Sequence, residues 1–301
     1  MKTNYYVLLI TIIICVTESF SQNSNKTDLE SRKVLILNEN INTEHFDGFP
    51  MIMPDGLTLY FSSDRPNGLG DLDIYVSHRY STEDEWQEPI NVGLQINSPA
   101  SDHSVTISND GHYLYFTSEK AGGHGDADLY VSYRQDITSD TSWSIAKNLG
   151  AIINTNKLEA CPFFHIDEKE TKLYFVSGRD GGLGGMDLYY TLWNDKHKTF
   201  ENPVALKISS SAHDMHFEPE KGLIWSSREG GVGKHDIWIA SFNKDKNIWE
   251  NPQYLKQPIN TEFNEGMPSI TKDFSELYFH SNRPNGIGSY DIYIAKKNKN
   301  N

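Results

Sequence analysis

Five copies of one motif follow each other along most of the chain, and this repetition constrains the fold more than any other feature. Each copy holds an aromatic-rich segment, a glycine-rich loop and an Asp that opens a further apolar segment. In the first copy these parts run from Leu59 through Gly68 to Asp73. The Asp recurs at 73, 128, 187, 236 and 291, so the copies are 55, 59, 49 and 55 residues apart. Spacings of this size are typical of architectures that repeat one supersecondary unit.

Each copy reads as four short strands. In the first copy, strands are expected over Phe49–Met53, Leu57–Ser62 and Ile74–His78, with a fourth after the next Trp or Phe. Apolar residues alternate within these segments, and turns rich in Gly, Pro and Asn separate them. No stretch shows a helical period. Four-stranded units at this spacing predict an all-β, five-bladed β-propeller over residues 34–297.

The N-terminal stretch predicts how the ring closes. Val34–Leu37 followed by Ile41–Glu44 is similar to Tyr254–Leu255 followed by Ile259–Glu262. The fifth copy has no such element after it. We therefore expect the N-terminal strand to complete the last blade as its outer strand, which hides a sheet edge.

The two ends of the chain are expected to lie outside the propeller. An apolar run over Tyr5–Val16, too short to span a bilayer, precedes small residues, which predicts a signal peptide over 1–21. Residues 22–33 are expected to be flexible, and 298–301 to form a polar tail. The predicted location is periplasmic or secreted, with no membrane insertion after the signal peptide is cleaved.

The acidic composition excludes some function classes. The chain has 27 Lys and Arg against 41 Asp and Glu, a net charge of −14. A nucleic-acid binder needs a basic face, so that class is excluded, and docking on an anionic membrane is disfavoured. Cys161 would be the single thiol after cleavage, which excludes a disulfide within the chain and a structural zinc site. We expect a monomer.

The repeated motifs are similar to those of one known family. The turn Pro54–Gly56, the segment Leu59–Arg65, the glycine-rich loop and Asp73–Val76 resemble the WD40-like, TolB-type propeller repeats of Bacteroidetes. The resemblance covers about residues 34–297. It implies a propeller that serves either as a noncatalytic module of envelope complexes or as the body of lyases acting on uronate-containing polysaccharides.

Residues that recur in every copy are expected to serve the blade. One aligned position holds a cation in all five copies: Arg65, Lys120, Arg179, Arg228 and Arg283. Each is expected to pair with a carboxylate such as Asp73 or Asp187. The alternative is that these cations, together with Trp225, form a substrate-binding lining.

A second aligned position is expected at the mouth of the central channel. It holds Asp47, Asp102, Glu159, Ala212 and Glu265. These carboxylates either pair with the cations around a ring or form a polar funnel. The pairs Asp71/Asp73 and Asp126/Asp128 leave calcium as a minor alternative. The glycine-rich loops lead into strands and not into helices, which argues against phosphate binding.

Residues that depart from the repeat are the candidates for catalysis. His213 and His216 lie at the channel mouth of the fourth copy, and His103 stands where the first and fifth copies have Gly. His280 replaces Ser, Thr or Val. These four His residues are the predicted catalytic groups, and no metal ligands are assigned.

This residue set suggests elimination from a uronate. Arg, or a divalent metal on His, would neutralise the sugar carboxylate, while His or Tyr removes the neighbouring proton. Loss of a sugar makes the enzyme a lyase, and loss of hydroxide makes it a dehydratase. With the family resemblance, this predicts a secreted enzyme acting on oligosaccharides of marine, ulvan-like polysaccharides. The alternatives are a noncatalytic glycan- or protein-binding scaffold and a glycoside hydrolase, which needs two carboxylates at a defined separation.

Overall fold

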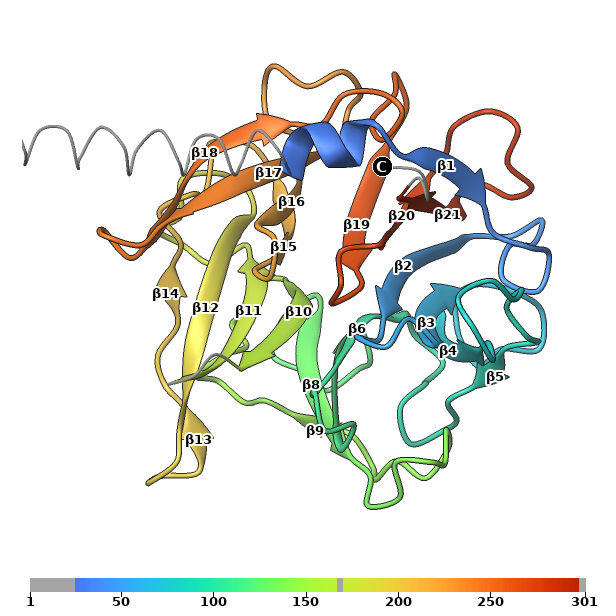
Figure 1. Ribbon diagram of the computed structural model, residues 1–301. Coiled ribbons are helices and arrows are strands. Elements are labelled where there is room, and N and C mark those ends of the chain that lie inside the picture. Colours follow the sequence, from blue (N-terminus) through green and yellow to red (C-terminus); the bar gives the residue numbers. More distant parts are fainter. Residues whose placement is uncertain (1–24, 167–169, 298–301) are drawn as a thin grey trace, which may run out of the picture.

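The structure is a computed structural model that describes residues 25–166 and 170–297. The expected signal peptide over 1–21 and the polar tail over 298–301 lie outside the described residues. Antiparallel sheets stand around a central axis (Figure 1), and this arrangement confirms the five-bladed propeller. In each blade the first three strands run outward from the centre, and each pairs with its neighbour in the sequence.

The blades are named by number in chain order. Their strands, from the centre outward, are: blade 1, β2 (Asp47–Ile52), β3 (Thr58–Ser63), β4 (Asp73–His78) and β5 (Ile90–Asn91); blade 2, β6 (Asp102–Ile107), β7 (Tyr113–Ser118), β8 (Asp128–Tyr133) and β9 (Lys147–Asn148); blade 3, β10 (Glu159–Ile166), β11 (Thr171–Ser177), β12 (Asp187–Asn194), β13 (Thr199–Phe200) and β14 (Val204–Ala205); blade 4, β15 (Asp214–Glu218), β16 (Leu223–Ser226), β17 (Asp236–Asn243) and β18 (Ile248–Tyr254); blade 5, β19 (Glu265–Ile270), β20 (Glu276–Ser281), β21 (Asp291–Lys296) and β1 (Lys33–Ile36).

The N-terminal strand closes the ring as expected. β1 pairs antiparallel with β21, with Val34 opposite Ala295 and Ile36 opposite Tyr293. Blade 5 is therefore built from both ends of the propeller sequence, and β21 does not form an exposed edge.

Residues 25–30 form a short helix in the segment that was expected to be flexible. Leu29 is fully buried and packs with Leu223 of blade 4 and Leu277 of blade 5. The Arg32 guanidinium donates a hydrogen bond of 2.6 Å to Asp28. A helix this short gives no detectable period in the sequence. Within the described residues, no helix has the length and apolar character needed to cross a membrane.

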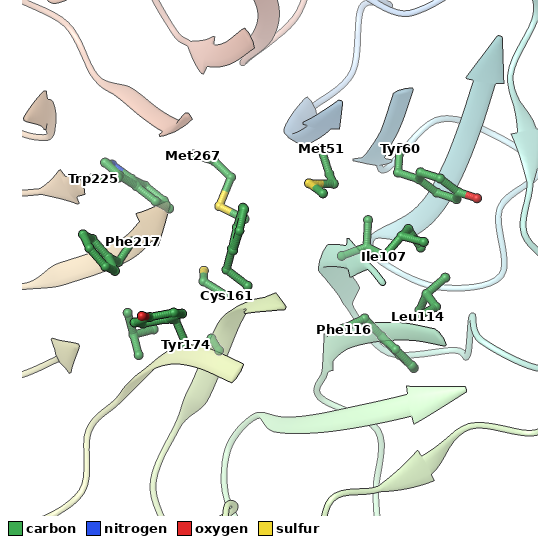
Figure 2. Packing of buried hydrophobic residues seen from close by; sticks show 14 of the residues in the cluster. Met51, Tyr60, Ile107, Leu114, Phe116, Cys161, Tyr174, Phe217, Trp225 and Met267 are labelled. Carbon is green, nitrogen blue, oxygen red and sulfur yellow. The ribbon is translucent and has the colours of Figure 1, made fainter. Parts of the chain in front are cut away.

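The core lies between the faces of neighbouring blades. Figure 2 shows Tyr174, Phe217 and Trp225 on one side of the cluster, with Met51 and Phe116 on the other. The large residues that alternate along the strands meet across the blade interfaces. Such burial is the main stabilising contribution to the fold, and Cys161, the cysteine of the described residues, is free.

A buried carboxylate anchors the start of each inner strand. Asp47 accepts hydrogen bonds from the Thr43 amide (2.6 Å) and hydroxyl (2.7 Å). It also accepts one from the Arg65 guanidinium at 2.7 Å. The equivalent ion pairs are Arg179–Glu159 (3.6 Å), Arg228–Asp214 (2.8 Å) and Arg283–Glu265 (3.1 Å). The ring of paired charges predicted from the sequence is therefore present in four blades, and in blade 2 the described residues show no ion pair between Lys120 and Asp102.

Two details of that ring were predicted wrongly. In blade 4 the anchoring acid is Asp214 and not Ala212, since β15 begins later than the sequence alignment assumed. The arginines pair with these acids and not with Asp73 or Asp187. Asp73 instead accepts the backbone N–H of Leu69 and so holds the glycine-rich loop. A side chain at Gly68 would collide with the Asp73 carboxylate, which explains the glycine there.

We predict that Arg65→Met lowers the free energy of unfolding by about 3–5 kcal/mol, because it leaves the Asp47 carboxylate buried without its countercharge. Urea denaturation followed by circular dichroism measures the change. Lys198→Met, which removes an exposed pair with Asp195, is the matched control and should be nearly neutral. Equal losses in the two variants would contradict the anchoring role.

Candidate functional site

The candidate site lies at the end of the channel where the inner strands begin, here called the acid-end mouth. The starts of β2, β6, β10, β15 and β19 and the glycine-rich loops form this end. The residues that depart from the repeat lie near this end of the channel.

A cluster of rings centres on Phe49. This residue has φ of 52° and lies in a bulge of β2. Its ring stacks on His103 of blade 2 at 4.9 Å and meets His280 of blade 5 at 5.2 Å. It also contacts Trp225 of blade 4 at 6.3 Å. Contacts with three other blades place the Phe49 ring across the channel. Sequence comparison missed Phe49, although Ser, Cys, His and Met at its aligned positions mark it as a departure.

His280 has a structural partner that explains its position. Its Nδ1 accepts the backbone N–H of Phe49 at 3.2 Å. Thr117, at the same position of blade 2, accepts the N–H of Cys161 at 3.0 Å in the same way. His280 therefore links blade 5 to blade 1, just as Thr117 links blade 2 to blade 3.

His216 is also buried within the protein. It contacts the Phe163 ring at 5.9 Å and faces the backbone carbonyls of Cys161 and Pro268. Burial lowers the pKa of His216 and of His280 to about 3, so both imidazoles are neutral near pH 7. Neither side chain is placed to exchange protons with a ligand in solution.

His213 does not join the ring cluster. It is exposed just before β15, where its backbone bridges to Met186. The structure thus brings His103, His280 and Trp225 together around Phe49. His213 lies outside this cluster, while His216 lies opposite Trp225 in the β15–β16 pairing and packs on Phe163.

Of the four predicted His residues, His103 best meets the needs of a reacting group. It is half-buried, and its Nδ1 lies 2.8 Å from the Ser104 hydroxyl. Protein surrounding the imidazole lowers its pKa to about 4, which keeps it neutral. A tautomer that donates from Nδ1 to Ser104 leaves Nε2 free to accept a proton.

Most of the cations that were predicted to line a substrate site form contacts within the propeller framework. Besides its carboxylate, each arginine guanidinium donates to a backbone carbonyl, as Arg65 does to Ile41 at 2.7 Å. The same contact is made by Arg179, Arg228 and Arg283. The Lys120 ammonium lies 3.8 Å from the centre of the Tyr130 ring, as the Arg65 guanidinium lies 5.0 Å from that of Tyr75, but it forms no ion pair with any described residue.

Blade 2 adds a carboxylate that sequence comparison missed. Glu119 follows β7, where the other blades have Asp64, Gly178, Ser227 and Asn282. Burial, then the negative charges of Asp71, Asp102 and Asp126, raise the pKa of Glu119. His103 and Glu119 are therefore two titratable side chains of blade 2 that the repeated network does not use, and beside them Lys120 keeps the aromatic contacts of the arginines without their ion pair.

The sequence left open calcium at the Asp pairs and a divalent metal on His, and the described residues show no geometry that matches either. Among the residues described, no group of three or more His, Cys, Asp or Glu side chains is arranged to hold a metal ion. Asp73 and Asp128 instead bind backbone amides of their own glycine-rich loops.

Comparison with solved structures identifies the class of fold. An endo-arabinase from Bacteroides thetaiotaomicron matches with a TM-score of 0.55 at 17% identity, covering 87% of this chain and 97% of that chain. A family 117 glycoside hydrolase produced by the marine bacterium Zobellia galactanivorans gives 0.54 at 15% identity, covering 88% and 90%. An α-L-arabinofuranosidase from Lactobacillus brevis gives 0.54 at 12%, covering 87% and 92%. At these identities the similarity shows a shared propeller fold.

No family model matches the chain, and no curated protein matches it. The resemblance to TolB-type repeats therefore rests on the internal motifs alone. The protein is a five-bladed β-propeller by its own strand pairing and by its structural neighbours.

We predict that His280→Thr is more stable than His280→Val by about 1 kcal/mol, because Thr can accept the Phe49 N–H as Thr117 accepts the Cys161 N–H. Thr and Val have nearly the same shape, so both variants leave the same cavity where the His280 ring was. Urea denaturation of both variants gives the difference. A Val variant as stable as the Thr variant would show that this hydrogen bond contributes nothing.

Acid should destabilise the fold through the buried histidines. His280 has a pKa of about 3 when folded and 6.5 ordinarily, so the unfolded chain binds more protons between these values. The stabilisation is complete above about pH 6.5 and is lost as the pH falls, by up to about 1.4 kcal/mol per pH unit. Glu218 acts in the opposite direction. Burial raises its pKa from the ordinary 4.5 to about 8, so between these values the folded protein binds more protons and its stability falls as the pH rises.

The test is therefore a comparison of variants. Between about pH 7 and pH 5, wild type should lose about 2 kcal/mol more stability than His280→Thr. Chemical denaturation at a series of pH values measures this. Parallel pH profiles would show that His280 titrates normally in the folded protein.

Proposed function

We propose that the protein is a carbohydrate-active enzyme that processes the end of an oligosaccharide at the acid-end mouth, beside blade 2. The observation that carries the proposal is the set of His103 and Glu119, which blade 2 presents outside the repeated network, with Lys120, whose ammonium forms no ion pair with a described residue. The structural neighbours support it, since an α-L-arabinofuranosidase, a family 117 glycoside hydrolase and an endo-arabinase share the propeller fold.

Hydrolysis of a neutral sugar fits these groups first. Glu119, with its raised pKa, donates a proton to the glycosidic oxygen as the bond to the leaving sugar breaks. Neutral His103 takes a proton from the attacking water, whose oxygen bonds to the sugar carbon. The anchoring acids such as Asp47 are fully buried and paired, so they do not supply this chemistry.

Elimination from a uronate is the second candidate. Lys120 would face the sugar carboxylate and His103 would remove the neighbouring proton, while Glu119 protonates the leaving oxygen. The negative charges of Asp71 and Asp126 beside Glu119 oppose a uronate here, which places this reaction second. In both reactions, His216 and His280 support the site from within the fold.

The proposal includes the predicted secretion, with the protein working as a monomer in the periplasm or outside the cell. Fractionation of expressing cells tests the first part. Sedimentation of the purified protein tests the second.

Mass spectrometry of oligosaccharides incubated with the protein tests the function. We expect products that gain one water from arabino-oligosaccharides or other neutral oligosaccharides; shorter unsaturated products or loss of water from uronate-containing ones would favour elimination. Glu119→Gln should lower the rate at least about 100-fold, because a general acid is lost. Asp180→Asn, an exposed acid on the same face of blade 3, should not. Unchanged masses across a panel of neutral and uronate-containing oligosaccharides would overturn catalysis in favour of a binding scaffold.

A further inference from the structure

A groove runs along the side of the propeller between blades 3 and 4, away from His103 and Glu119. Its volume is about 1030 Å³. Tyr174 and Tyr190 of blade 3 line one side, and Phe242 and Trp249 of blade 4 line the other. In Figure 1 the strands that carry these residues, β11 and β12 against β17 and β18, belong to adjoining blades.

Unequal blade lengths create this groove. The first two strands of blade 3, β10 and β11, have eight and seven residues, whereas β15 and β16 of blade 4 have five and four. The inner hairpin of blade 4 is thus too short to cover the face of blade 3. The outer strands β17 and β18, with eight and seven residues, extend further and form the far wall.

The other side of the short blade is filled. There, the helix over 25–30 places Leu29, fully buried, against blades 4 and 5. On the blade 3 side the described residues leave the space open, and Phe242 is 39% exposed. The same shortening therefore gives a sealed interface on one side and an accessible groove on the other.

The groove has aromatic walls. Phe242 and Trp249 lie 5.2 Å apart, and Tyr174 and Tyr190 lie 6.0 Å apart. Figure 2 shows Tyr174 beside Phe217, the residue on which Trp249 packs at 5.3 Å. Fixed aromatic faces with a few polar groups among them are typical of small-molecule sites, and the flat faces of sugar rings pack well on them.

The charges of the lining are unlike those of the whole chain. The protein has a net charge of −14, yet the charged residues lining the groove are four lysines against the single acid Glu220: Lys172, Lys207, Lys244 and Lys246. His165 contacts Glu220 at 3.6 Å, and Lys246 pairs with Glu250 at 3.1 Å. Lys207 and Lys244 form no ion pair with a described residue and are exposed.

We propose that this groove is a second carbohydrate site, specific for an anionic oligosaccharide. Sugar rings pack on Phe242 and Trp249, while Lys207 and Lys244 bind the carboxylates. The choice of a sugar rests on the proposed function, whereas the charge preference rests on the groove alone. The site retains acidic chains at the flank of the propeller, separate from the chemistry at the acid-end mouth.

Calorimetric titration of the full-length protein with tetragalacturonate tests this. We expect binding that weakens with added salt, and no binding of uncharged maltotetraose at the same concentrations. The double variant K207Q/K244Q should bind about five- to tenfold more weakly, because each exposed charge contributes up to about 1 kcal/mol. The matched double variant K33Q/K147Q removes two exposed lysines elsewhere and should bind as wild type does. Phe242→Ala, which removes one aromatic face of the groove at a 39% exposed position, should bind several-fold more weakly.

Three results would overturn the proposal: no binding of tetragalacturonate, equal binding by the two double variants, or equal binding of maltotetraose. Dimerisation that Phe242→Ala abolishes would instead assign the groove to a second copy of the chain. Glu119→Gln keeps the groove intact, so it should retain tetragalacturonate binding. An inactive protein that still binds tetragalacturonate through Lys207 and Lys244 would refute the proposed function but not this site.

Discussion

The buried carboxylate at the start of each inner strand is the interaction on which the rest of the structure depends. Asp47 shows why: one side chain holds the preceding turn through Thr43 and the following loop through Arg65. A charge removed from water is stabilising only when its partners are complete, so the surrounding turn and loop are fixed together with it. Because a buried carboxylate lies at the start of each inner strand, the five inner strands begin at the same height along the channel. This common height determines the shape of the channel mouth.

The two candidate sites lie where single blades depart from this repeated arrangement. In blade 2, Lys120 replaces the arginine and forms no ion pair with a described residue, while His103 on β6 and Glu119 just after β7 come from paired strands. In blade 4 the departure is one of length and not of chemistry, and its effect appears at the blade interface. The two candidate sites thus arise from different kinds of irregularity, one in residue type and one in strand length.

The fold could be predicted from the sequence because each blade repeats the same strands and turns, and the sequence also contained the closing strand. The site could be predicted only in part. His280 looked like a catalytic departure, yet it bonds to the backbone of another blade, a contact that no comparison of aligned positions can show. Asp214 was missed because a shorter hairpin shifts the alignment by two residues. Glu119 was visible in the sequence, but its raised pKa depends first on burial and then on Asp71, Asp102 and Asp126, which the fold brings near it.

The pairing of β1 with β21 has a consequence for how the molecule is made. The strand that completes the ring is synthesised before every other described strand of the propeller, and its partner after them. Blade 5 therefore cannot form on a growing chain, and the ring stays open until synthesis has passed Lys296. Proteolytic removal of Lys33–Ile36 would reopen the ring at the same seam.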